Sequence, residues 1–340
     1  MNGELMAAEM AEQPAVLARV TARAPADTEA VRAVVPRPLA GVVFLARGSS
    51  DNAAVFGRYL AELRAGRPAG LAAPSLYTRY HATVDWRGYL VVALSQSGAT
   101  PEIISTCRAV RTGGAVVLGI TNEPQSRLAD AVDLLLCTDA GPERAVPATK
   151  TVTAQLAVLV TVTSALRSGA ADAAADAAAG DGTLDGSPGA VAAVLGDPGP
   201  VHRLADRWRG LDRLVVAGRG LAYAAALETA LKVKETTGIL AEGISTADLL
   251  HGPIAAVYAG APVLLVDGGG PADTDLDDLR ALLASRRAQA ASLSVPPGLP
   301  EAVHVIAAIT RGQQLAYELA RARDVNPDAP AHLSKVTATT

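Results

Sequence analysis

One short segment combines hydroxyls, an amide and a glycine at the point where an apolar strand should end: Ser95-Gln96-Ser97-Gly98-Ala99-Thr100. Pro101 stands where the first residue of a following helix is expected, with Thr100 as its N-cap. Such a turn directs unpaired backbone N–H groups and the positive end of the helix dipole toward one spot, which suits a phosphate. An ordinary capped turn uses the same residue types, so phosphate binding is a hypothesis at this point.

A second turn supports the same hypothesis. Gly48-Ser49-Ser50 follows the first predicted strand in the same half of the chain. In a doubly wound parallel sheet the turns after the strands lie at the carboxyl edge, where ligands bind. We therefore expect the two turns to form one phosphate cradle, made of Ser49, Ser50 and the segment from Ser95 to Thr100.

A charged helix is predicted over Ala222 to Thr237, and Gly238 is the residue expected to end it. Glu228, Lys232 and Glu235 share one face of that helix. Such charges usually form a solvated stripe, where each pair contributes only about a few tenths of a kcal/mol. The charge spacing alone therefore favours a surface role.

A single imidazole, His251, stands just before the Gly252-Pro253 break. A lone histidine in such a position is more often a hydrogen-bonded loop residue than a catalytic one. The residues around it leave its role undecided.

Short apolar runs alternate with longer helical patterns, which predicts parallel sheets covered by helices. The first series of predicted strands consists of Val42 to Ala46, Leu90 to Leu94, Val116 to Ile120 and Leu134 to Cys137. The second series consists of Leu214 to Ala217 and Val263 to Val266, with weaker members at Ser292 to Val295 and Val303 to Ile306.

The two halves of the chain repeat one unit. Val43 to Gly48 aligns with Val215 to Gly220 as a strand, an Arg-Gly turn and the start of an Ala-rich helix. The predicted fold is therefore α/β, with two tandem doubly wound parallel-sheet domains. The expected organisation is an N-terminal helical segment (1–34), a first domain with the cradle (35–167), an Ala/Asp/Gly-rich linker (168–195), a second domain with the charged helix (196–325) and a C-terminal tail (326–340).

Composition excludes several classes of protein. The 340 residues carry 30 Lys+Arg against 34 Asp+Glu, so the chain offers no basic field for nucleic acid. Two cysteines fit neither a disulfide framework nor a zinc site, which suits a reducing cytosol. No signal peptide and no membrane span is expected, because the first residues are acidic and the apolar windows are short.

Taken together, these motifs resemble the sugar isomerase (SIS) domain family, in particular the tandem-SIS isomerase portion of glutamine-fructose-6-phosphate amidotransferases. The resemblance covers nearly the whole chain. The matching pieces are Met10 to Pro14, Gly48 to Ser50, Leu94 to Thr100, Thr149-Lys150, Ala217 to Gly220, Ala226 to Glu228, Lys232 to Glu235, Ala241-Glu242, His251 to Pro253 and Leu333 to Lys335. The fold that the resemblance implies is flavodoxin-like in each domain.

The resemblance also implies a role for each matching residue. Glu235 corresponds to the carboxylate that moves a proton between C1 and C2, with Lys232 beside it. A carboxylate in an apolar helix cleft can act as acid and base in turn. His251 corresponds to the ring-opening group, contributed by the second subunit of a homodimer, and Lys335 to a lysine that can form an imine with the open-chain carbonyl. The residues expected to bind the sugar 6-phosphate are Ser49, Ser50, Ser95, Gln96, Ser97 and Thr100.

Two departures from the family affect the expected reaction. The chain begins Met1-Asn2-Gly3 without the cysteine of a glutaminase domain, so we expect release of ammonia from a hexosamine 6-phosphate instead of synthesis from glutamine. In the segment from Val146 to Lys150, Ala148 replaces a serine that is usual in the family. Val146 and Ala148 are expected among the substrate-binding residues, and the hydroxyl missing at Ala148 could make room for an N-acetyl group on the substrate.

The leading hypothesis is a cytosolic deaminase that converts glucosamine 6-phosphate to fructose 6-phosphate without metal or organic cofactor. A lyase that removes the C3 hydroxyl of N-acetylglucosamine 6-phosphate would use the same proton abstraction. A deglycase acting on a fructosamine 6-phosphate is a third possibility. A sugar-phosphate sensor is the alternative outside enzymes, although Glu235, His251 and Lys335 would then be superfluous.

Overall fold

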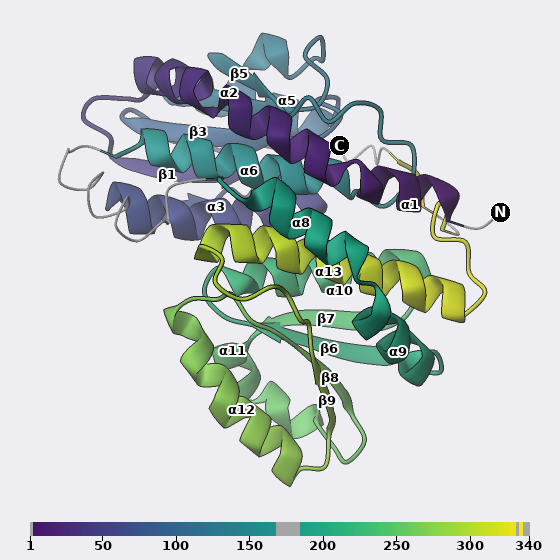
Figure 1. The fold of residues 1–340 in the computed structure, drawn as a ribbon. Coiled ribbons are helices and arrows are strands. Elements are labelled where there is room, and N and C mark those ends of the chain that lie inside the picture. Colours follow the sequence, from purple (N-terminus) through teal and green to yellow (C-terminus); the bar gives the residue numbers. More distant parts are fainter. Residues whose placement is uncertain (1–2, 168–183, 331–332, 336–340) are drawn as a thin grey trace. The chain divides into compact units, whose positions relative to one another are not determined.

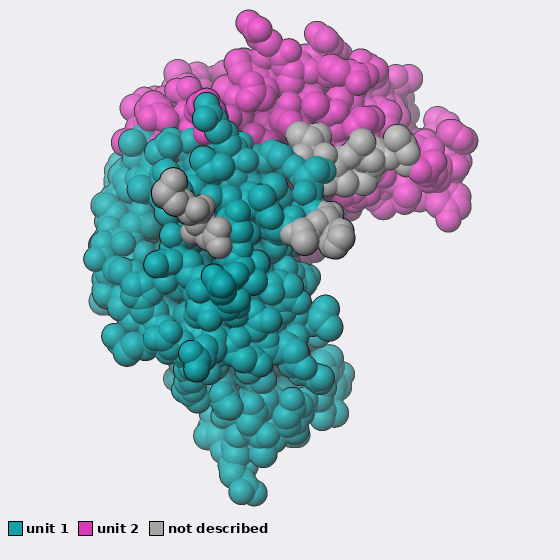
Figure 2. All heavy atoms as spheres, turned by 90° about the vertical axis from the view of Figure 1, so that its right-hand side faces the viewer, with its two compact units in different colours: residues 1–15, 143–153, 185–335 teal, residues 16–142, 154–184, 336–340 magenta. Residues whose placement is uncertain are grey.

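The computed structural model describes residues 3–167, 184–330 and 333–335. These residues form two compact units, shown in different colours in Figure 2. Unit 1 contains residues 1–15, 143–153 and 185–335, and unit 2 contains residues 16–142, 154–184 and 336–340. Most of the predicted linker, residues 168–183, lies outside the described residues. The domain boundaries drawn from the sequence stay a prediction.

Unit 2 contains a five-stranded parallel sheet with the order β2-β1-β3-β4-β5 (Figure 1). Its strands are β1 (Gly41–Leu45), β2 (Ala69–Leu71), β3 (Tyr89–Leu94), β4 (Val116–Thr121) and β5 (Leu134–Cys137). The chain runs from β1 to β2 on one side and then to β3 on the other. The topological switch point of the sheet therefore lies between β1 and β3.

Helices cover this sheet on apolar faces. They are α2 (Gln13–Val34), α3 (Ser49–Ala65), α4 (Ser75–Thr78), α5 (Pro101–Thr112), η1 (Ala129–Ala131) and α6 (Lys150–Ala165), of which α2 and α6 begin in unit 1. Ile103 and Cys107 of α5 pack with Val91 of β3 in a buried cluster. On α3, a Cβ added to Gly57 would lie 2.8 Å from Phe44 and 3.1 Å from Leu159, so only glycine permits this close packing.

Unit 1 contains a four-stranded parallel sheet with the order β7-β6-β8-β9. Its strands are β6 (Arg213–Gly218), β7 (Leu240–Ser245), β8 (Pro262–Val266) and β9 (Gln289–Ser292). Its helices are α1 (Glu4–Ala11), α8 (Ser187–Gly196), α9 (Gly199–Trp208), α10 (Ala222–Thr237), α11 (Thr246–Leu250), η2 (Pro253–Ala256), η3 (Pro271–Asp273), α12 (Thr274–Ser285) and α13 (Glu301–Ala322). The two parallel sheets confirm the predicted α/β fold class.

The helix α10 is packed between its sheet and α13. It contacts β6, β7 and β8 as well as α13. A Cβ at Gly312 of α13 would lie 2.1 Å from the Thr229 hydroxyl of α10, so glycine allows the two helices to approach closely. The helix ends at Gly238, which has a φ of 73° and was expected at this position. Because α10 is covered on both sides, its polar face cannot be fully solvated.

The predicted strands are confirmed in six places, wrong for Val303 to Ile306 and wrong for all but one residue of Ser292 to Val295. Val303 to Ile306 belongs to α13, because four apolar residues in sequence also fit a buried helix turn. Only Ser292 of the stretch from Ser292 to Val295 lies in β9. The strands β2 and β7 were not predicted, because β2 is short and β7 carries Gly243 and Glu242 among its apolar residues.

The predicted internal repeat is seen in matching backbone turns. Gly48 after β1 has a φ of 61°, and Gly220 after β6 has a φ of 59°. Both conformations favour glycine because a side chain would crowd the backbone. Within the described part of the chain, none of the helices has the length and apolar character needed to cross a membrane.

Candidate functional site

The cradle residues follow two neighbouring strands of unit 2. β1 and β3 pair in parallel, so the turns that follow them meet at the same edge of the sheet. The helix α5 begins at Pro101 with Thr100 as its N-cap, as predicted, and α3 begins at Ser49. The two helix N-termini therefore bring unpaired N–H groups to the switch point, where an anion would be stabilised.

The turn after β3 is tightly constrained. The hydroxyl oxygens of Ser95 and Thr100 are 3.4 Å apart, and the Ala99 N–H donates to Ser97 Oγ at 3.3 Å. Thr100 makes no side-chain capping bond to its own helix. Gly98 has a φ of 57°, and a Cβ there would lie 2.0 Å from Ser126 Oγ. This packing holds the turn in a conformation that leaves its hydroxyls near the helix end.

Charged residues beside this turn were not predicted as part of the site. Arg47 Nε donates to Glu102 Oε2 at 3.0 Å, and Glu102 sits in the first turn of α5. Burial raises the pKa of Asp51, and the nearby Arg47 guanidinium partly offsets that effect. The only sequence signal for this cluster was the position of these residues next to the two glycine turns.

A second group of candidate residues consists of three charged side chains on α10 in unit 1. Lys232 Nζ donates to Glu235 Oε2 and lies 3.6 Å from Glu228 Oε1. The side chains of Glu228 and Lys232 are each 1% exposed, while that of Glu235 is 24% exposed. The charged face of α10 is thus buried at Glu228 and Lys232. The charge spacing alone favours a solvated surface there. Glu235 faces an ammonium and not a purely apolar cleft.

The Lys232 side chain is held as an ammonium ion. Burial disfavours its charge, but the carboxylates of Glu228 and Glu235 outweigh that effect, with a further contribution from Glu143. The pKa of Lys232 is therefore above its usual value. An ammonium at this place orients Glu235 and stabilises negative charge that forms nearby.

A fully buried carboxylate, Glu143, organises a third group of residues in unit 1. It accepts hydrogen bonds from the Thr149 N–H at 2.9 Å, from the Thr151 hydroxyl at 2.7 Å and from Lys335 Nζ at 2.9 Å. Burial opposes its ionisation, but the Lys335 charge and the Thr151 hydrogen bond outweigh burial, so the pKa of Glu143 is lowered. Glu143 was not predicted as a site residue, since its charged partner Lys335 is 192 positions away in the sequence.

The segment that carries Val146 and Ala148 is fixed at both ends. Glu9 accepts hydrogen bonds from the backbone N–H groups of Arg144 and Ala145. The Val146 N–H donates to the Asp328 carbonyl at 3.0 Å. Val146 and Ala148 themselves are half-buried. Both residues are thus presented by a rigid segment, in the same unit as α10.

His251 lies at the surface of unit 1. It follows the short helix α11 as its C-cap, and its backbone N–H donates to Ala247 and Asp248 carbonyls. The residue is exposed, as are the neighbouring side chains Leu250 (43%) and Tyr258 (54%). Its imidazole is therefore accessible to another molecule.

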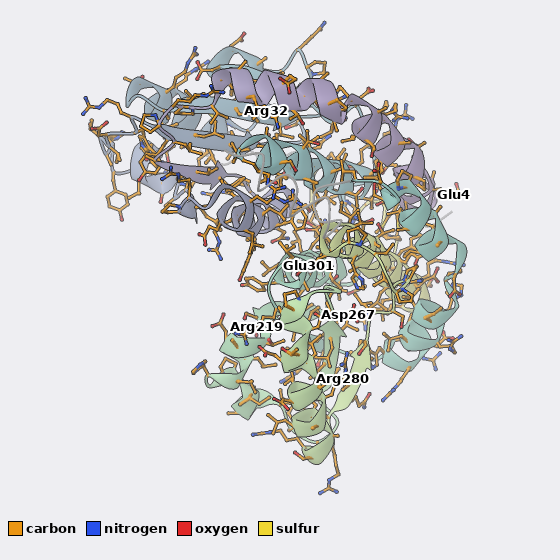
Figure 3. All side chains as sticks on the ribbon, turned by 60° about the vertical axis from the view of Figure 1, so that its left-hand side comes forward. Glu4, Arg32, Arg219, Asp267, Arg280 and Glu301 are labelled. Atoms are coloured by element: carbon orange, nitrogen blue, oxygen red, sulfur yellow. The ribbon has the colours of Figure 1, made fainter. Side chains whose placement is uncertain are left out.

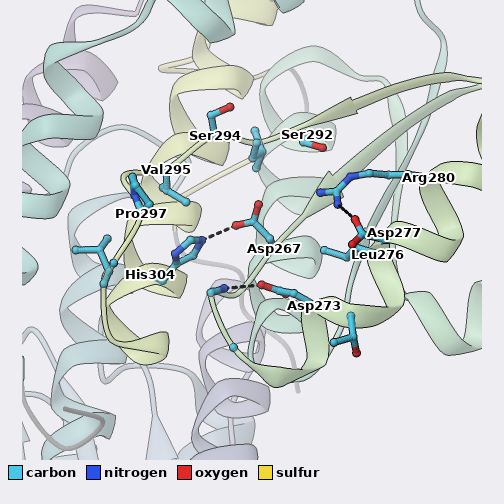
Figure 4. Close-up of a pocket in the computed structure, with 16 residues that line it drawn as sticks. Asp267, Asp273, Leu276, Asp277, Arg280, Ser292, Ser294, Val295, Pro297 and His304 are labelled. Atoms are coloured by element: carbon cyan, nitrogen blue, oxygen red, sulfur yellow. Dashed lines mark hydrogen bonds and ion pairs between the residues drawn. The ribbon is translucent and has the colours of Figure 1, made fainter. Parts of the chain in front are cut away.

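A cavity of about 640 Å³ lies at the carboxyl edge of the second sheet (Figure 4). Figure 3 shows that Asp267 and Arg280, which line it, come from the part of unit 1 around β8 and α12. Asp273 accepts hydrogen bonds from the N–H groups of Gly268 and Gly269 at 2.9 and 2.8 Å. His304 pairs with Asp267 at 2.5 Å. The chain's own carboxylate thus occupies N–H groups that could otherwise bind a phosphate.

Comparison with known proteins identifies the family. A model of the SIS domain matches residues 41–165 and 209–297. These two ranges contain all the strands of both sheets. The chain belongs to the SIS domain family.

The SIS chain is similar to proteins of known name over almost its full length. The isomerizing glutamine-fructose-6-phosphate aminotransferase of Aeropyrum pernix is 34% identical over 97% of this chain and 56% of that protein. The enzyme of the same name from Xanthomonas campestris is 33% identical over 97% of this chain and 58% of its own length. The chain therefore spans little more than half the length of these relatives.

Solved structures share the SIS fold. A candidate phosphosugar isomerase from Silicibacter pomeroyi has a TM-score of 0.85 and 29% identity, with 96% of this chain and 100% of that chain covered. The C-terminal domain of glucosamine-fructose-6-phosphate aminotransferase from Francisella tularensis has a TM-score of 0.84 and 25% identity, with 96% and 98% covered. Both the fold and the resemblance inferred from the sequence are confirmed.

The predicted site residues of this SIS protein fall into two sets. Unit 2 brings together the cradle residues Ser49, Ser50, Ser95, Gln96, Ser97 and Thr100 at one sheet edge. Unit 1 contains Glu235, Lys232, Lys335, His251, Val146 and Ala148. Within unit 1, Glu143 links two of these groups, since its charge acts on both Lys335 and Lys232.

Proposed function

We propose that this SIS protein is an enzyme that acts on a hexosamine 6-phosphate by proton transfer at C2. The observation that supports the proposal most is the position of Glu235 on α10, a quarter exposed and paired with the buried ammonium of Lys232. A carboxylate in such a place can accept and return a proton. The relatives are named glutamine-fructose-6-phosphate aminotransferases, and these names favour a sugar phosphate as the substrate of this chain.

The proposed reaction is a deaminating aldose–ketose isomerisation. His251 assists opening of the ring, and Glu235 then removes the proton from C2 of the open-chain aldehyde. The lone pair of the free amine assists formation of the enolamine, and Glu235 returns the proton to C1. Water hydrolyses the resulting ketimine, so glucosamine 6-phosphate and water give fructose 6-phosphate and ammonia.

In this proposal the cradle binds the 6-phosphate group of the substrate. The N-termini of α3 and α5 provide backbone N–H groups, and the serine and threonine hydroxyls provide further donors. The residues assigned to this role are Ser49, Ser50, Ser95, Gln96, Ser97 and Thr100.

Ser97→Ala tests the cradle. We expect it to weaken binding of the sugar phosphate by about 1 to 3 kcal/mol, as for a hydrogen bond to a charged group. Isothermal titration calorimetry should show this loss for glucosamine 6-phosphate and a much smaller one for glucosamine. The control is Ser105→Ala in α5, the helix that follows this turn, where the Ser105 hydroxyl donates to the Glu102 carbonyl. Equal losses for both sugars would mean that Ser97 does not bind the phosphate.

Ala148 favours a second candidate, dehydration of N-acetylglucosamine 6-phosphate. Ala148 lies two residues after Val146 on the segment that the Val146 N–H bond to Asp328 holds in place. A serine at this position would add a hydroxyl that can bind a free amine on the substrate. An acetamido nitrogen has its lone pair committed to the amide carbonyl and assists the enolamine route poorly. The carbanion at C2 would then expel the C3 hydroxyl, which leaves as water and creates a C2–C3 double bond.

One product assay separates the two reactions. Purified protein is incubated in parallel with glucosamine 6-phosphate and with N-acetylglucosamine 6-phosphate, while ammonia and ultraviolet absorbance are followed. Deamination predicts ammonia and fructose 6-phosphate in equal amounts from the first sugar. If only the N-acetyl sugar reacts, with rising absorbance and no ammonia, the deaminase proposal is wrong and the protein is a dehydratase. Reaction of neither sugar would refute the proposed substrate class.

We propose further that His251 acts from a second copy of the chain. Its exposure beside Leu250 and Tyr258 supports a contact with a partner. Sedimentation measurements on the active protein should then show a homodimer, and a fully active monomer would contradict this assignment.

A further inference from the structure

The cavity of unit 1 lies where β8 and β9 end, and none of its lining residues has a role in the proposed reaction (Figure 4). Asp267 directly follows β8, while Ser292 ends β9 and Ser294 lies in the loop behind it. The helix α12 and the first turn of α13 complete the wall. Ligands of α/β proteins bind outside the carboxyl ends of parallel strands, and about 640 Å³ is enough for a small organic molecule.

His304, on α13, presents an unsatisfied nitrogen in this wall. Its Nε2 lies 2.5 Å from Asp267 Oδ1, and Nε2 carries the hydrogen because a carboxylate accepts. Nδ1 makes no hydrogen bond within the described residues, although His304 is only 6% exposed. A Cβ added to Gly269 would lie 2.7 Å from Nδ1, so glycine keeps the space beside this nitrogen clear. A polar atom of a buried residue that the protein does not satisfy can be satisfied by a ligand.

The charges around the cavity exclude a phosphate. Among the described residues that line it, three carboxylates stand against a single guanidinium, that of Arg280. This guanidinium is already paired, since Arg280 Nη1 donates to Asp277 Oδ1 at 2.8 Å. The loop N–H groups of Gly268 and Gly269 are also occupied, by the carboxylate of Asp273. The ligand must therefore bring hydrogen-bond donors of its own.

The polar and apolar parts of the wall together suit a sugar ring. Ring hydroxyls can donate to His304 Nδ1 and to Asp267 Oδ2, the oxygen that His304 leaves open, and can accept from the hydroxyl of Ser294. The C–H faces of the ring need an apolar surface beside these groups. The cavity provides one with Leu276, Leu293, Val295, Pro297 and Leu299.

We propose that this cavity is a second binding site, which takes a hexose or hexosamine that carries no phosphate. The ligand is held through its hydroxyls by His304, Asp267 and Ser294. No bond of the sugar is made or broken there. The site is separate from the phosphate cradle, which belongs to unit 2, and the inference does not depend on the proposed reaction.

Hydrogen–deuterium exchange with peptide mass spectrometry locates the binding. We expect glucose or glucosamine at about 50 mM, a concentration suited to weak binding, to slow exchange in residues 267–280 and 292–299 of the wild type. Comparing the two sugars shows whether the amine contributes. An excess of inorganic phosphate should leave this protection unchanged. Protection by neither sugar, protection confined to residues 49–52 and 95–100, or its loss on addition of phosphate would each overturn the proposal.

Filling the cavity should abolish that binding. Ser294 is exposed at the cavity, and only its backbone carbonyl is bonded, by Arg311, so Ser294→Trp is expected to fold. We expect it to raise the Kd of the sugar, measured by ligand-observed NMR, at least about 10-fold. Ser285→Trp is the matched control, because Ser285 is equally exposed at the end of α12 but does not line the cavity. The same Kd in both variants would contradict the assignment.

Asp267→Asn tests the hydrogen bonds themselves. We expect this variant to raise the Kd about 10- to 100-fold, as for loss of a hydrogen bond to a charged group. Asp278→Asn, on the exposed side of α12 and outside the cavity, should leave the Kd unchanged. A wild-type Kd in folded Asp267→Asn would refute the role of this carboxylate. If Asp267→Asn does not fold, Ser294→Trp and the exchange data on the wild type still decide whether the site exists.

Discussion

Glu235→Gln is expected to reduce exchange of the substrate C2 proton with deuterated solvent by about 10²- to 10⁴-fold, the usual loss when a general base is removed. The amide keeps the shape of the side chain and can still accept a hydrogen bond from Lys232, but it cannot take up a proton. Exchange is measured by proton NMR on glucosamine 6-phosphate and, in parallel, on N-acetylglucosamine 6-phosphate. Because exchange reports proton abstraction itself, the result holds for either the deaminase or the dehydratase.

Binding should survive in this variant. The phosphate donors assigned above belong to unit 2, whereas Glu235 belongs to unit 1, so calorimetry should still detect the sugar phosphate. Glu242→Gln is the matched control, because Glu242 is an exposed carboxylate on the neighbouring strand β7 of the same unit. Wild-type exchange in Glu235→Gln would remove Glu235 from the proposed role.

The elements that carry the site were predictable because their signals are local. Thr100 and Pro101 mark the start of α5, and Gly238 marks the end of α10, through backbone preferences that hold in any fold. Parallel pairing of β1 with β3 also follows from short apolar runs separated by helices. The position of the two turns at one edge of the sheet could therefore be predicted from the sequence, while their role as a phosphate cradle stays a prediction.

The electrostatics of the site could not be predicted in the same way. Glu228 and Lys232 have the spacing of an exposed i,i+4 pair, and only the packing of α10 between its sheet and α13 makes them 1% exposed. Glu143 meets Lys335 across 192 residues of sequence, so no local pattern marks the contact. Tertiary packing decides both cases, and it is also the reason why Val303 to Ile306 forms a helix.

The two sheets of the repeat have diverged at the edges where ligands bind. After β1 and β3 the N–H groups of the helix ends are accompanied by hydroxyls. After β8 the corresponding loop is closed by Asp273, whose carboxylate bonds to Gly268 and Gly269. A phosphate would be repelled there by that charge and by Asp267. This difference supports the proposal that the phosphate binds at the turns of the first sheet and not at the loop after β8.

Lys232→Met is expected to lower the free energy of unfolding by about 3 to 5 kcal/mol, the range for breaking a buried ion pair on one side. Methionine fills a similar volume, so the loss comes from removing the ammonium that lies between the carboxylates of Glu228 and Glu235. Lys234→Met, two residues along α10 and exposed, is the control and should change stability by less than about 0.5 kcal/mol. Urea unfolding followed by circular dichroism measures both.

The difference in unfolding free energy between wild type and Lys232→Met should depend on pH if it has an electrostatic origin. The pKa of Lys232 is raised above its ordinary value of 10.5 in the folded protein, so the stability linked to its proton is fully present below pH 10.5. This stability is lost only as the pH rises through the raised pKa of Lys232 in the folded protein. The gap between wild type and Lys232→Met should therefore be constant from about pH 7 to 10 and narrow above that range. A gap of less than about 1 kcal/mol at pH 7 would show that the buried charges are not paired as described, and Glu235 would then lack the partner that orients it.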